Sequence, residues 1–279
     1  MLDEWVGRAR EVEDEMTAPA ARRLAAMLDR APPPLNRGAE VPPHWVAILF
    51  DDAQPQSRLG PDGHPAKGDF LPPVPLPRRM LAGRRMRHAA PLRIGDRLVR
   101  RSEIMSITPK EGRSGRLVFV TVRHVVAGPA GVVATEEQDI AYREAPSGAA
   151  KAEVPAAAPD AAWREPFSPD PVLLFRYSAL TFNGHRIHYD ADYARGVEGY
   201  PGLVVNGGLT ILLLLEAALR HAPPGAALRT ADIRTLRPLT CGRGFHLAGT
   251  LPDDDGRRLL WAEDETGAMA LRIEARITP

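Results

Sequence analysis

The most constraining feature of the sequence is the apolar run Leu209–Leu219, which contains one charged residue, Glu216. A helix that is apolar on all sides is buried all round, so this run predicts a central helix over residues 208–221. Gly207 and Gly208 precede it and leave its first amides open to close approach. A helix followed by antiparallel strands that can wrap it predicts an α+β domain, and the expected strands are 229–236, 243–250, 257–264 and 268–277.

The first half of the chain has the same strand signals but no comparable helix. Three β-branched segments separated by Gly, Pro and Ser turns predict an antiparallel meander over Pro91–Thr108, Leu117–Ala127 and Gly131–Arg143. The best candidate for a central helix there is the short, basic segment Leu81–His88. We therefore interpret the first half as a degenerate copy of the second.

Composition divides the chain between these halves. Residues 145–162 are mostly Ala and Pro without periodicity, which is typical of a linker. This predicts an N-terminal domain over 1–144 and a second domain over 163–279. We further expect helices within 3–29, strands at Trp45–Phe50 and Phe175–Leu180, and a loop over 51–80 that forms either a substrate wall or a surface insertion.

Two histidines lie three residues apart just before the central helix. The stretch Phe175–Asp190 reads FRYSALTFNGHRIHYD, and Gly199–Gly207 reads GYPGLVVNG. Asn183-Gly184 predicts a turn, and His185 and His188 follow it. The first amides of a helix lack internal partners and carry a positive dipole, so a helix start beside imidazoles can stabilise an oxyanion while a proton moves.

These two motifs resemble the MaoC-like hot-dog dehydratases and hydratases, which act on acyl thioesters. The likeness is closest to the branch that holds type 2 hydroxyacyl-thioester dehydratase and mesaconyl-C4-CoA (3-methylfumaryl-CoA) hydratase. The resemblance implies a double hot-dog fold, a hydro-lyase activity on an enoyl or 3-hydroxyacyl thioester such as mesaconyl-C4-CoA, and no cofactor beyond the CoA of the substrate. It also implies that the two halves form one continuous sheet and that the chain forms a homodimer.

The resemblance assigns roles to particular residues. The family places an Asp five residues before a His; here Asn183 takes the Asp position and His188 takes the His position. Asn183 cannot carry a proton, so His188 would perform most of the proton transfer, with His185 or water assisting. The family's oxyanion donor is a helix-start amide after a His-Gly pair, which here is Asn206-Gly207. Arg186 stands where proline is common and would steer an acidic acyl group or form a salt bridge.

Other interpretations of the same residues stay open at this point. His185, His188 and Asp190 are possible metal ligands, although no second cluster of ligand-type residues supports a metal site, and we predict none. Glu216 is either a paired core carboxylate or, with His188 as the alternative base, the catalytic group of an acyl-CoA thioesterase. The asparagines at both motif positions are also compatible with a non-catalytic acyl-thioester-binding protein.

Coenzyme A carries phosphates, so a basic rim is expected near the site. Arg84 and Arg85 are our first candidates, in a cluster with Arg78, Arg79 and Arg87, and Arg234 and Arg237 form a second cluster. An acyl carrier protein is an alternative carrier of the acyl group. Arginine clusters are often solvated surface faces, which is the alternative interpretation of both sets.

The overall charge excludes some classes of partner. The formal net charge is +1, which argues against binding of nucleic acid or of a membrane surface. Cys241 is the single cysteine, so neither an internal disulfide nor a cysteine-built zinc site is possible. No apolar run reaches the roughly 18 residues of a membrane span, and the charged N-terminus is unlike a targeting peptide. We therefore expect a cytoplasmic protein.

Overall fold

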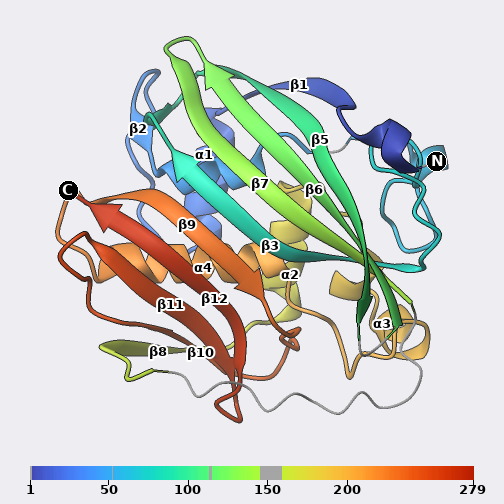
Figure 1. Cartoon of the computed structure of the whole chain (residues 1–279). Helices are drawn as coiled ribbons and strands as arrows, with labels where there is room; N and C mark the ends of the chain where they lie inside the picture. Colours follow the sequence, from blue (N-terminus) through green and yellow to red (C-terminus); the bar gives the residue numbers. More distant parts are fainter. Residues whose placement is uncertain (1, 52, 113–114, 145–158) are drawn as a thin grey trace.

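The computed structural model of the chain describes residues 2–51, 53–112, 115–144 and 159–279 (Figure 1). Ten strands form one sheet in the order β1-β5-β6-β7-β3-β9-β12-β11-β10-β8, and every neighbouring pair is antiparallel. The strands are β1 (Ala9–Glu15), β3 (Arg78–His88), β5 (Arg97–Gly112), β6 (Gly115–Gly128), β7 (Gly131–Arg143), β8 (Trp163–Phe167), β9 (Ala227–Thr235), β10 (Phe245–Gly249), β11 (Arg257–Asp264) and β12 (Met269–Thr278).

The two halves of this sheet repeat one plan. Read from its outer edge to the centre, the first half runs β1-β5-β6-β7-β3 and the second runs β8-β10-β11-β12-β9. Each half therefore has its first strand at the edge and its second long strand at the centre. β3 pairs with β9 from Gly83↔Arg234 to Arg87↔Thr230, which makes the sheet continuous. The double hot-dog fold predicted from the sequence is confirmed by this arrangement.

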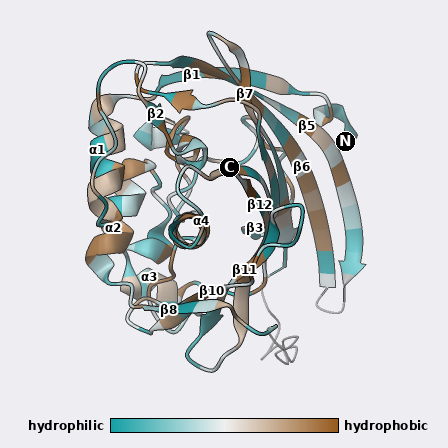
Figure 2. Cartoon of the chain, turned by 90° about the vertical axis from the view of Figure 1, so that its left-hand side faces the viewer, coloured by the Kyte–Doolittle hydropathy of each residue, from teal (hydrophilic) through white to brown (hydrophobic). Residues whose placement is uncertain are grey.

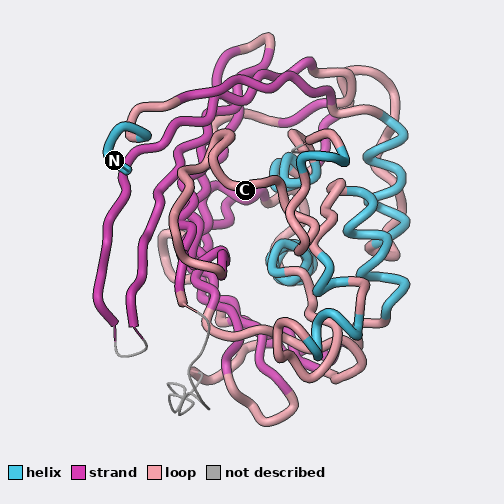
Figure 3. The backbone as a smooth tube through the Cα atoms, turned by 90° about the vertical axis from the view of Figure 1, so that its right-hand side faces the viewer, coloured by secondary structure: helices cyan, strands magenta, loops and turns pink. Residues whose placement is uncertain are grey.

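The helices lie on the concave side of the sheet. They are α1 (Ala18–Met27), α2 (Pro171–Leu180), α3 (Ala191–Gly196) and α4 (Gly207–Arg220), with short 3-10 helices η1 (Leu2–Trp5), η2 (Pro43–Ile48), η3 (Gln56–Arg58) and η4 (Arg186–His188). Figure 2 shows α4 end-on inside the curve of the sheet, with α1 and α2 farther out, and Figure 3 shows the same layers from the opposite side. A separate two-stranded ribbon joins β2 (Glu40–Val41) and β4 (Leu92–Arg93). None of the described helices is long and apolar enough to cross a membrane.

α4 is the predicted central helix. Every residue from Leu209 to Ala218 is buried, and the helix packs against β9, β10, β11 and β12 and against η2 of the first half. Burying an aliphatic side chain of this size stabilises the fold by about 1.5–3 kcal/mol. The start of α4 is consequently held firmly against the sheet.

The first half has no such helix. Between β1 and β3, the described residues form α1, the two-residue strand β2, η2 and η3, and then a loop that leads into β3. The prediction of a helix at Leu81–His88 is wrong, because this segment is the long central strand β3. Its inner positions alternate with outer ones: Met86 and His88 are buried, whereas Arg87 is exposed. That alternation is the strand period, which the basic composition of the segment obscures.

Two expected strands are helices instead. Phe175–Leu180 belongs to α2, which Asp170 caps through its side chain, with Pro171 in the first turn. Trp45–Phe50 falls largely within η2, which begins after Pro42. Short apolar runs do not distinguish a strand from a buried helix, and here proline and capping signals decide in favour of the helix.

The N-terminal helix prediction is correct only in part. Thr17 caps α1 as a helix, but residues 9–15 form the edge strand β1, which pairs with β5. The predicted meander and the four strands after α4 are confirmed as β5 to β7 and β9 to β12. Strand β7 ends at Arg143 and β8 begins at Trp163, while most of the predicted linker, residues 145–158, lies outside the described residues. The domain boundaries at 144 and 163 stay predictions.

Candidate active site

His188, the last residue of η4, is buried against the chain segment that leads into α4. Its Nδ1 lies 2.7 Å from the Val204 carbonyl oxygen, so Nδ1–H donates and Nε2 is left as the basic nitrogen. Burial lowers the pKa of His188 to about 4, although the Val204 hydrogen bond acts in the opposite direction. The imidazole is therefore neutral at neutral pH, with a fixed tautomer and one lone pair available to accept a proton.

Ser178, at the end of α2, joins the two asparagines of the motifs. Its carbonyl oxygen accepts the Asn183 backbone N–H at 2.8 Å, and its Oγ accepts from Asn206 Nδ2 at 3.3 Å. Between Ser178 and Asn183 in the sequence, Phe182 adopts a φ of 48°, in the left-handed region, and so turns the chain sharply out of α2. Asn183 Oδ1 accepts the His185 backbone N–H at 3.0 Å, which leaves the two Nδ2 protons of Asn183 as donors.

The start of α4 is open on one side and closed on the other. A Cβ added at Gly207 would meet no atom within 4 Å, whereas one added at Gly208 would lie 2.2 Å from Tyr177 Oη. The Asn206 side chain makes no cap, and its Oδ1 is buried without a partner among the described residues. Free amides, an unpartnered amide oxygen and open space at Gly207 together form a polar recess at a helix N-terminus.

Tyr177 borders this recess and was not singled out from the sequence. Burial raises its pKa to about 12, so its hydroxyl stays protonated and can only donate or accept a hydrogen bond as a neutral group. The hydroxyl touches Gly208 and makes no hydrogen bond to a described residue. It is therefore a second candidate donor beside the α4 amides. Tyr177 lies eleven residues before His188, and this spacing gives no periodic signal that would reveal its role in the sequence.

The loop over residues 51–77 closes over the histidine motif at its tip. Gly63, with a φ of 84°, packs so closely on Gly184 that an added Cβ would lie 1.9 Å from the Gly184 carbonyl oxygen. The backbone N–H of Arg186 donates to the Asp62 carbonyl at 2.9 Å, and Arg186 Nη1 donates to Pro61. Of the two interpretations made from the sequence, the contacts favour a wall of the site over a surface insertion.

Arg186 itself is engaged in structural contacts. Its Nη2 lies 2.7 Å from Asp190 Oδ2, and its guanidinium stacks over the Tyr193 ring at 4.0 Å. Asp190 also caps α3 by accepting the Tyr193 backbone N–H. Because Asp190 is occupied in this way, it is not grouped with His185 and His188 as a metal ligand would be.

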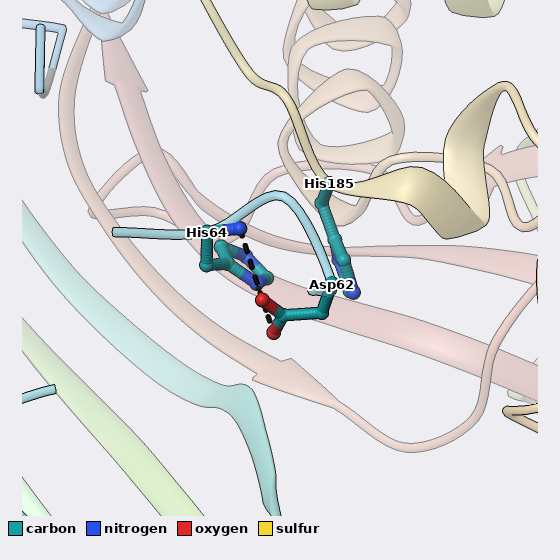
Figure 4. Close-up of side chains that lie close together, drawn as sticks. All are labelled: Asp62, His64 and His185. Carbon is teal, nitrogen blue, oxygen red and sulfur yellow. Dashed lines mark hydrogen bonds and ion pairs between the residues drawn. The ribbon is translucent and has the colours of Figure 1, made fainter. Parts of the chain in front are cut away.

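A different ligand-type cluster forms at the loop tip, as Figure 4 shows. Asp62, His64 and His185 each offer a ligand atom, and these atoms lie within 4.8 Å of one another. Asp62 Oδ2 is 3.0 Å from His64 Nδ1, and the His64 and His185 rings approach to 3.9 Å between centroids. Two imidazoles and a carboxylate are a donor set that fits zinc or a related transition ion. The same contacts also join the loop tip to the motif without an ion.

The surroundings of His185 in this cluster keep its imidazole neutral. Burial, together with the nearby His64 and His188, lowers the pKa of His185 to about 3. The pKa of Asp62 is lowered although burial opposes it, because His64 donates to the carboxylate. The His185 ring lies edge-on to His188 with centroids 5.3 Å apart. The ionised Asp62 thus lies beside His64 and His185, and the neutral His185 ring leads on to His188.

Glu216 is a structural carboxylate in this fold. It is 1% exposed, and its Oε1 accepts from Trp45 Nε1 at 2.7 Å and from His44 Nε2 at 2.7 Å, while Oε2 pairs with Arg30. Although burial opposes it, these contacts lower its pKa to about 2. All three partners come from the first half, so Glu216 joins the halves. This geometry favours the core role over that of a base for thioester hydrolysis.

The basic clusters lie in different places. Arg84 and Arg85 are neighbours on β3 and are paired with acidic residues of β7. A surface cavity of about 230 Å³ is lined by Arg237 and Arg243 and reaches Leu239 and Thr240. Leu239 accepts the Val205 N–H, and Thr240 pairs with Val204, so this cavity adjoins the segment that holds His188. Of the second predicted cluster, Arg237 lines this cavity and Arg234 does not; Arg237 pairs with Asp264 and Arg243 with Glu265. The position of the cavity favours Arg237 over Arg84 and Arg85 for the phosphates of CoA.

Among the predicted site residues, the structure brings together His188, His185, Asn183, Asn206 and Gly207, which all lie near the start of α4. It adds the loop-tip pair Asp62 and His64 together with Tyr177 and Ser178. Asp62-Gly63-His64 stands in a Gly- and Pro-rich loop more than 100 residues before the motif. Sequence distance of this kind hides contacts that only folding creates.

Comparisons with known proteins return relatives that act on acyl thioesters. The family model described as hydroxyacyl-thioester dehydratase type 2 matches residues 43–241. A mesaconyl-C(4)-CoA hydratase from Chloroflexus aurantiacus is 48% identical over 271 residues, which cover 96% of this chain and 94% of that protein. The mitochondrial hydroxyacyl-thioester dehydratase type 2 of Schizosaccharomyces pombe is 52% identical over 50 residues, covering 18% of this chain and 17% of its own.

Solved structures agree with the fold. A MaoC-like dehydratase from Phytophthora capsici superposes with a TM-score of 0.74 at 14% identity, covering 99% of this chain and 97% of that one. A Mycobacterium tuberculosis protein described as having a double hotdog fold gives a TM-score of 0.59 at 16% identity, covering 98% of this chain and 96% of its own. Identities this low bear on the fold alone, and they match the ten-stranded double sheet.

Proposed function

The chain belongs to the type 2 hydroxyacyl-thioester dehydratase family, and from this premise we propose that it hydrates an enoyl-CoA ester reversibly, with mesaconyl-C4-CoA as the substrate. The proposal depends most on one observation: His188 is held by Val204 as a neutral base beside the unsatisfied start of α4. The 48% identity to a mesaconyl-C(4)-CoA hydratase supports the choice of substrate.

In the proposed mechanism, the thioester oxygen accepts hydrogen bonds from the Gly207 amide and the Tyr177 hydroxyl. These donors stabilise the negative charge that develops on the oxygen as the double bond is attacked. Asn183 Nδ2 donates to a water molecule and positions it. His188 Nε2 removes a proton from this water as its oxygen bonds to the β-carbon.

The same imidazole completes the reaction. His188 is then an imidazolium in a site that lowers its pKa to about 4, so it is a strong proton donor. It delivers the proton to the α-carbon, and the enolate collapses back to the thioester. The elements of water are added across the double bond, His188 returns to its neutral form, and the thioester bond stays intact.

The subunit arrangement and location are part of the proposal. Val172 and Phe175 are 63% and 64% exposed and lie three residues apart on α2, and Phe182, just after the helix, is 62% exposed. Apolar exposure of this kind supports a homodimer, which light scattering after size-exclusion chromatography tests. We propose that this dimer acts in the cytoplasm on CoA esters, and comparison of CoA and acyl-carrier-protein thioesters tests the carrier.

The deciding experiment follows the absorbance of the conjugated enoyl thioester with mesaconyl-C4-CoA and crotonyl-CoA, while a thiol reagent reports hydrolysis in parallel. Loss of the band without free thiol is the expected result. Release of thiol would instead make the protein a thioesterase. Binding of either ester without a change in either signal would make it a binding protein. Asn183→Ala is expected to lower turnover by about 10²-fold, the loss typical of a positioning group.

A further inference from the structure

Two adjacent arginines of β3 differ in how their guanidinium groups are used. Arg85 is fully engaged: Nη1 and Nη2 bond the two Asp139 oxygens at 2.6 and 3.1 Å, and Nε bonds Glu137 at 3.1 Å. Arg84 has one partner, with Nε 3.2 Å from Glu136 Oε1. Neither Nη atom of Arg84 donates a hydrogen bond to a described residue. Its outer fork is therefore available for a ligand.

The register of the sheet places Arg84 on the concave side. It pairs with Gln138 of β7 and with Ile233 of β9, whose side chain is 3% exposed in the core around α4. Met86, two residues along the strand and on the same face, is also 3% exposed. Arg84 thus lies at the junction of the halves, facing inward, and yet 21% of its side chain is accessible. An inward-facing charge that solvent reaches lines an internal space.

This internal space adjoins the recess at the start of α4. Tyr177 Oη touches Gly208, and the charges of Arg84 and Glu136 both act on that hydroxyl, in opposite directions. Glu136 is held ionised, since Arg84, His124 and Gln138 lower its pKa against the effect of burial. Glu136 therefore fixes the Nε side of Arg84, and the Nη side remains free.

We propose that Arg84 binds the free carboxylate of a dicarboxylic acyl thioester and so sets the substrate class; this rests on the proposed hydratase function. A dicarboxylic acid joined to CoA through one carboxyl keeps the other as an anion. Burying that anion is costly unless it is paired, and the planar fork of arginine binds a carboxylate through two hydrogen bonds. Arg84 would then act on the acyl end of the substrate and not on the phosphates of CoA.

The test compares two substrates that differ at this position. Crotonyl-CoA has the same four-carbon backbone as mesaconyl-C4-CoA but no free carboxylate. Arg84→Met is expected to lower kcat/KM for mesaconyl-C4-CoA by at least about 100-fold and to change that for crotonyl-CoA by less than about threefold, since one buried charged pair is lost from one substrate only. Arg84→Lys should restore part of the loss.

The controls separate recognition from folding. Arg84→Met/Glu136→Gln also removes the carboxylate that loses its guanidinium partner in the single variant and keeps only Gln138. This double variant should show the same loss of selectivity with an unfolding temperature closer to wild type. Arg85→Met, on the opposite face, should leave the ratio of the two kcat/KM values unchanged, because any effect at the CoA end is common to both substrates. An equal fall for both substrates in the Arg84 variants, or an unchanged ratio, would overturn the proposal.

Binding measurements keep this test independent of the hydratase assignment. If the wild-type protein hydrates neither ester, the proposed function fails, and calorimetry with succinyl-CoA and butyryl-CoA then tests Arg84 alone. Tighter binding of succinyl-CoA that disappears in Arg84→Met would support the carboxylate site. Equal affinity of the wild type for these two esters would overturn it.

Discussion

The two halves of the sheet share one strand order, but different groups cover their concave sides. In the second half α4 covers that side, with a nearly continuous buried apolar surface from Leu209 to Ala218. In the first half, the register aligns the inner-face residues Ser102, His124 and Glu136 in one row, and Ser102 Oγ lies 2.7 Å from His124 Nδ1. This face, which has no central helix, keeps buried apolar residues such as Val120 and Val122, and it carries the polar row among them.

This difference indicates that the two halves of the repeated fold have different roles. The buried helix of the second half fixes the position of a helix start, and the motif loop sets His188 beside it. The first half, which needs no such scaffold, can present charged groups such as Arg84 to the same internal space. We infer that the second half performs the chemistry and that the first half selects the acyl group. The predictions below test this division.

The largest expected effect comes from the histidines of the two halves. His188→Ala should lower kcat for hydration by about 10³-fold or more, because the proposed general acid and base is lost. His124→Ala, in the first half, should lower kcat for crotonyl-CoA by less than about tenfold, since His124 bonds Ser102 and not the reacting atoms. Steady-state kinetics on both variants measure this. Comparable losses in the two variants would contradict the division.

Acid should destabilise both halves. Burial lowers the pKa of His88 and His124 in the first half to about 4, and that of His188 likewise, while His185 falls to about 3. Between pH 6.5 and about 4 the unfolded chain therefore binds protons that the folded chain does not. The stability is complete above pH 6.5 and is lost as the pH falls, by about 1.4 kcal/mol per pKa unit for each group at most.

Urea unfolding at pH 7 and pH 5 measures this loss, which we expect to reach several kcal/mol. His124→Asn should reduce the difference between the two pH values, and so should His188→Asn. If one substitution removes nearly all of the difference, the acid response belongs to a single half. A free energy of unfolding that does not change between pH 7 and pH 5 would contradict the buried, neutral state of these histidines.

Glu216 tests the connection between the halves. Glu216→Ala leaves Arg30, His44 and Trp45 without their acceptor, and loss of one partner of a buried ion pair typically costs about 3–5 kcal/mol. We expect the lower end of this range, because Arg30 is partly exposed. Glu216→Gln, which keeps an acceptor, should be less destabilised and should retain hydration per folded molecule. Loss of hydration in a folded Glu216→Gln protein would restore a catalytic role for this residue.

The smallest expected effect concerns the donor that borders the helix start. Tyr177→Phe should lower kcat by about tenfold, as expected for the loss of one hydrogen bond to a developing charge.

Gly208→Ala should reduce stability more than Gly207→Ala does, because only the methyl group at position 208 would meet Tyr177 Oη. Calorimetric unfolding checks this order. The double variant Tyr177→Phe/Gly208→Ala should be more stable than Gly208→Ala alone, because the hydroxyl that the new methyl group meets is gone. If the double variant is no more stable, the clash lies elsewhere.

Several features of this protein are determined by sequence alone. The apolar run Leu209–Leu219 predicts a buried helix because no surface helix is apolar on all sides, and the meander strands follow from their β-branched alternation. Asn183, His185 and His188 are recognisable because they lie close together in one motif. Local patterns of this kind need no knowledge of the rest of the fold.

Other features are decided by the tertiary structure. The segment Leu81–His88 is a strand because β7 and β9 pair with its two edges, and neither partner is visible in its own composition. The contact of Asp62 and His64 with His185, the neutral state of His188, and the unequal use of Arg84 and Arg85 depend on groups brought together from distant parts of the chain. Burial and pairing set the chemistry of these side chains, and both are properties of the folded sheet.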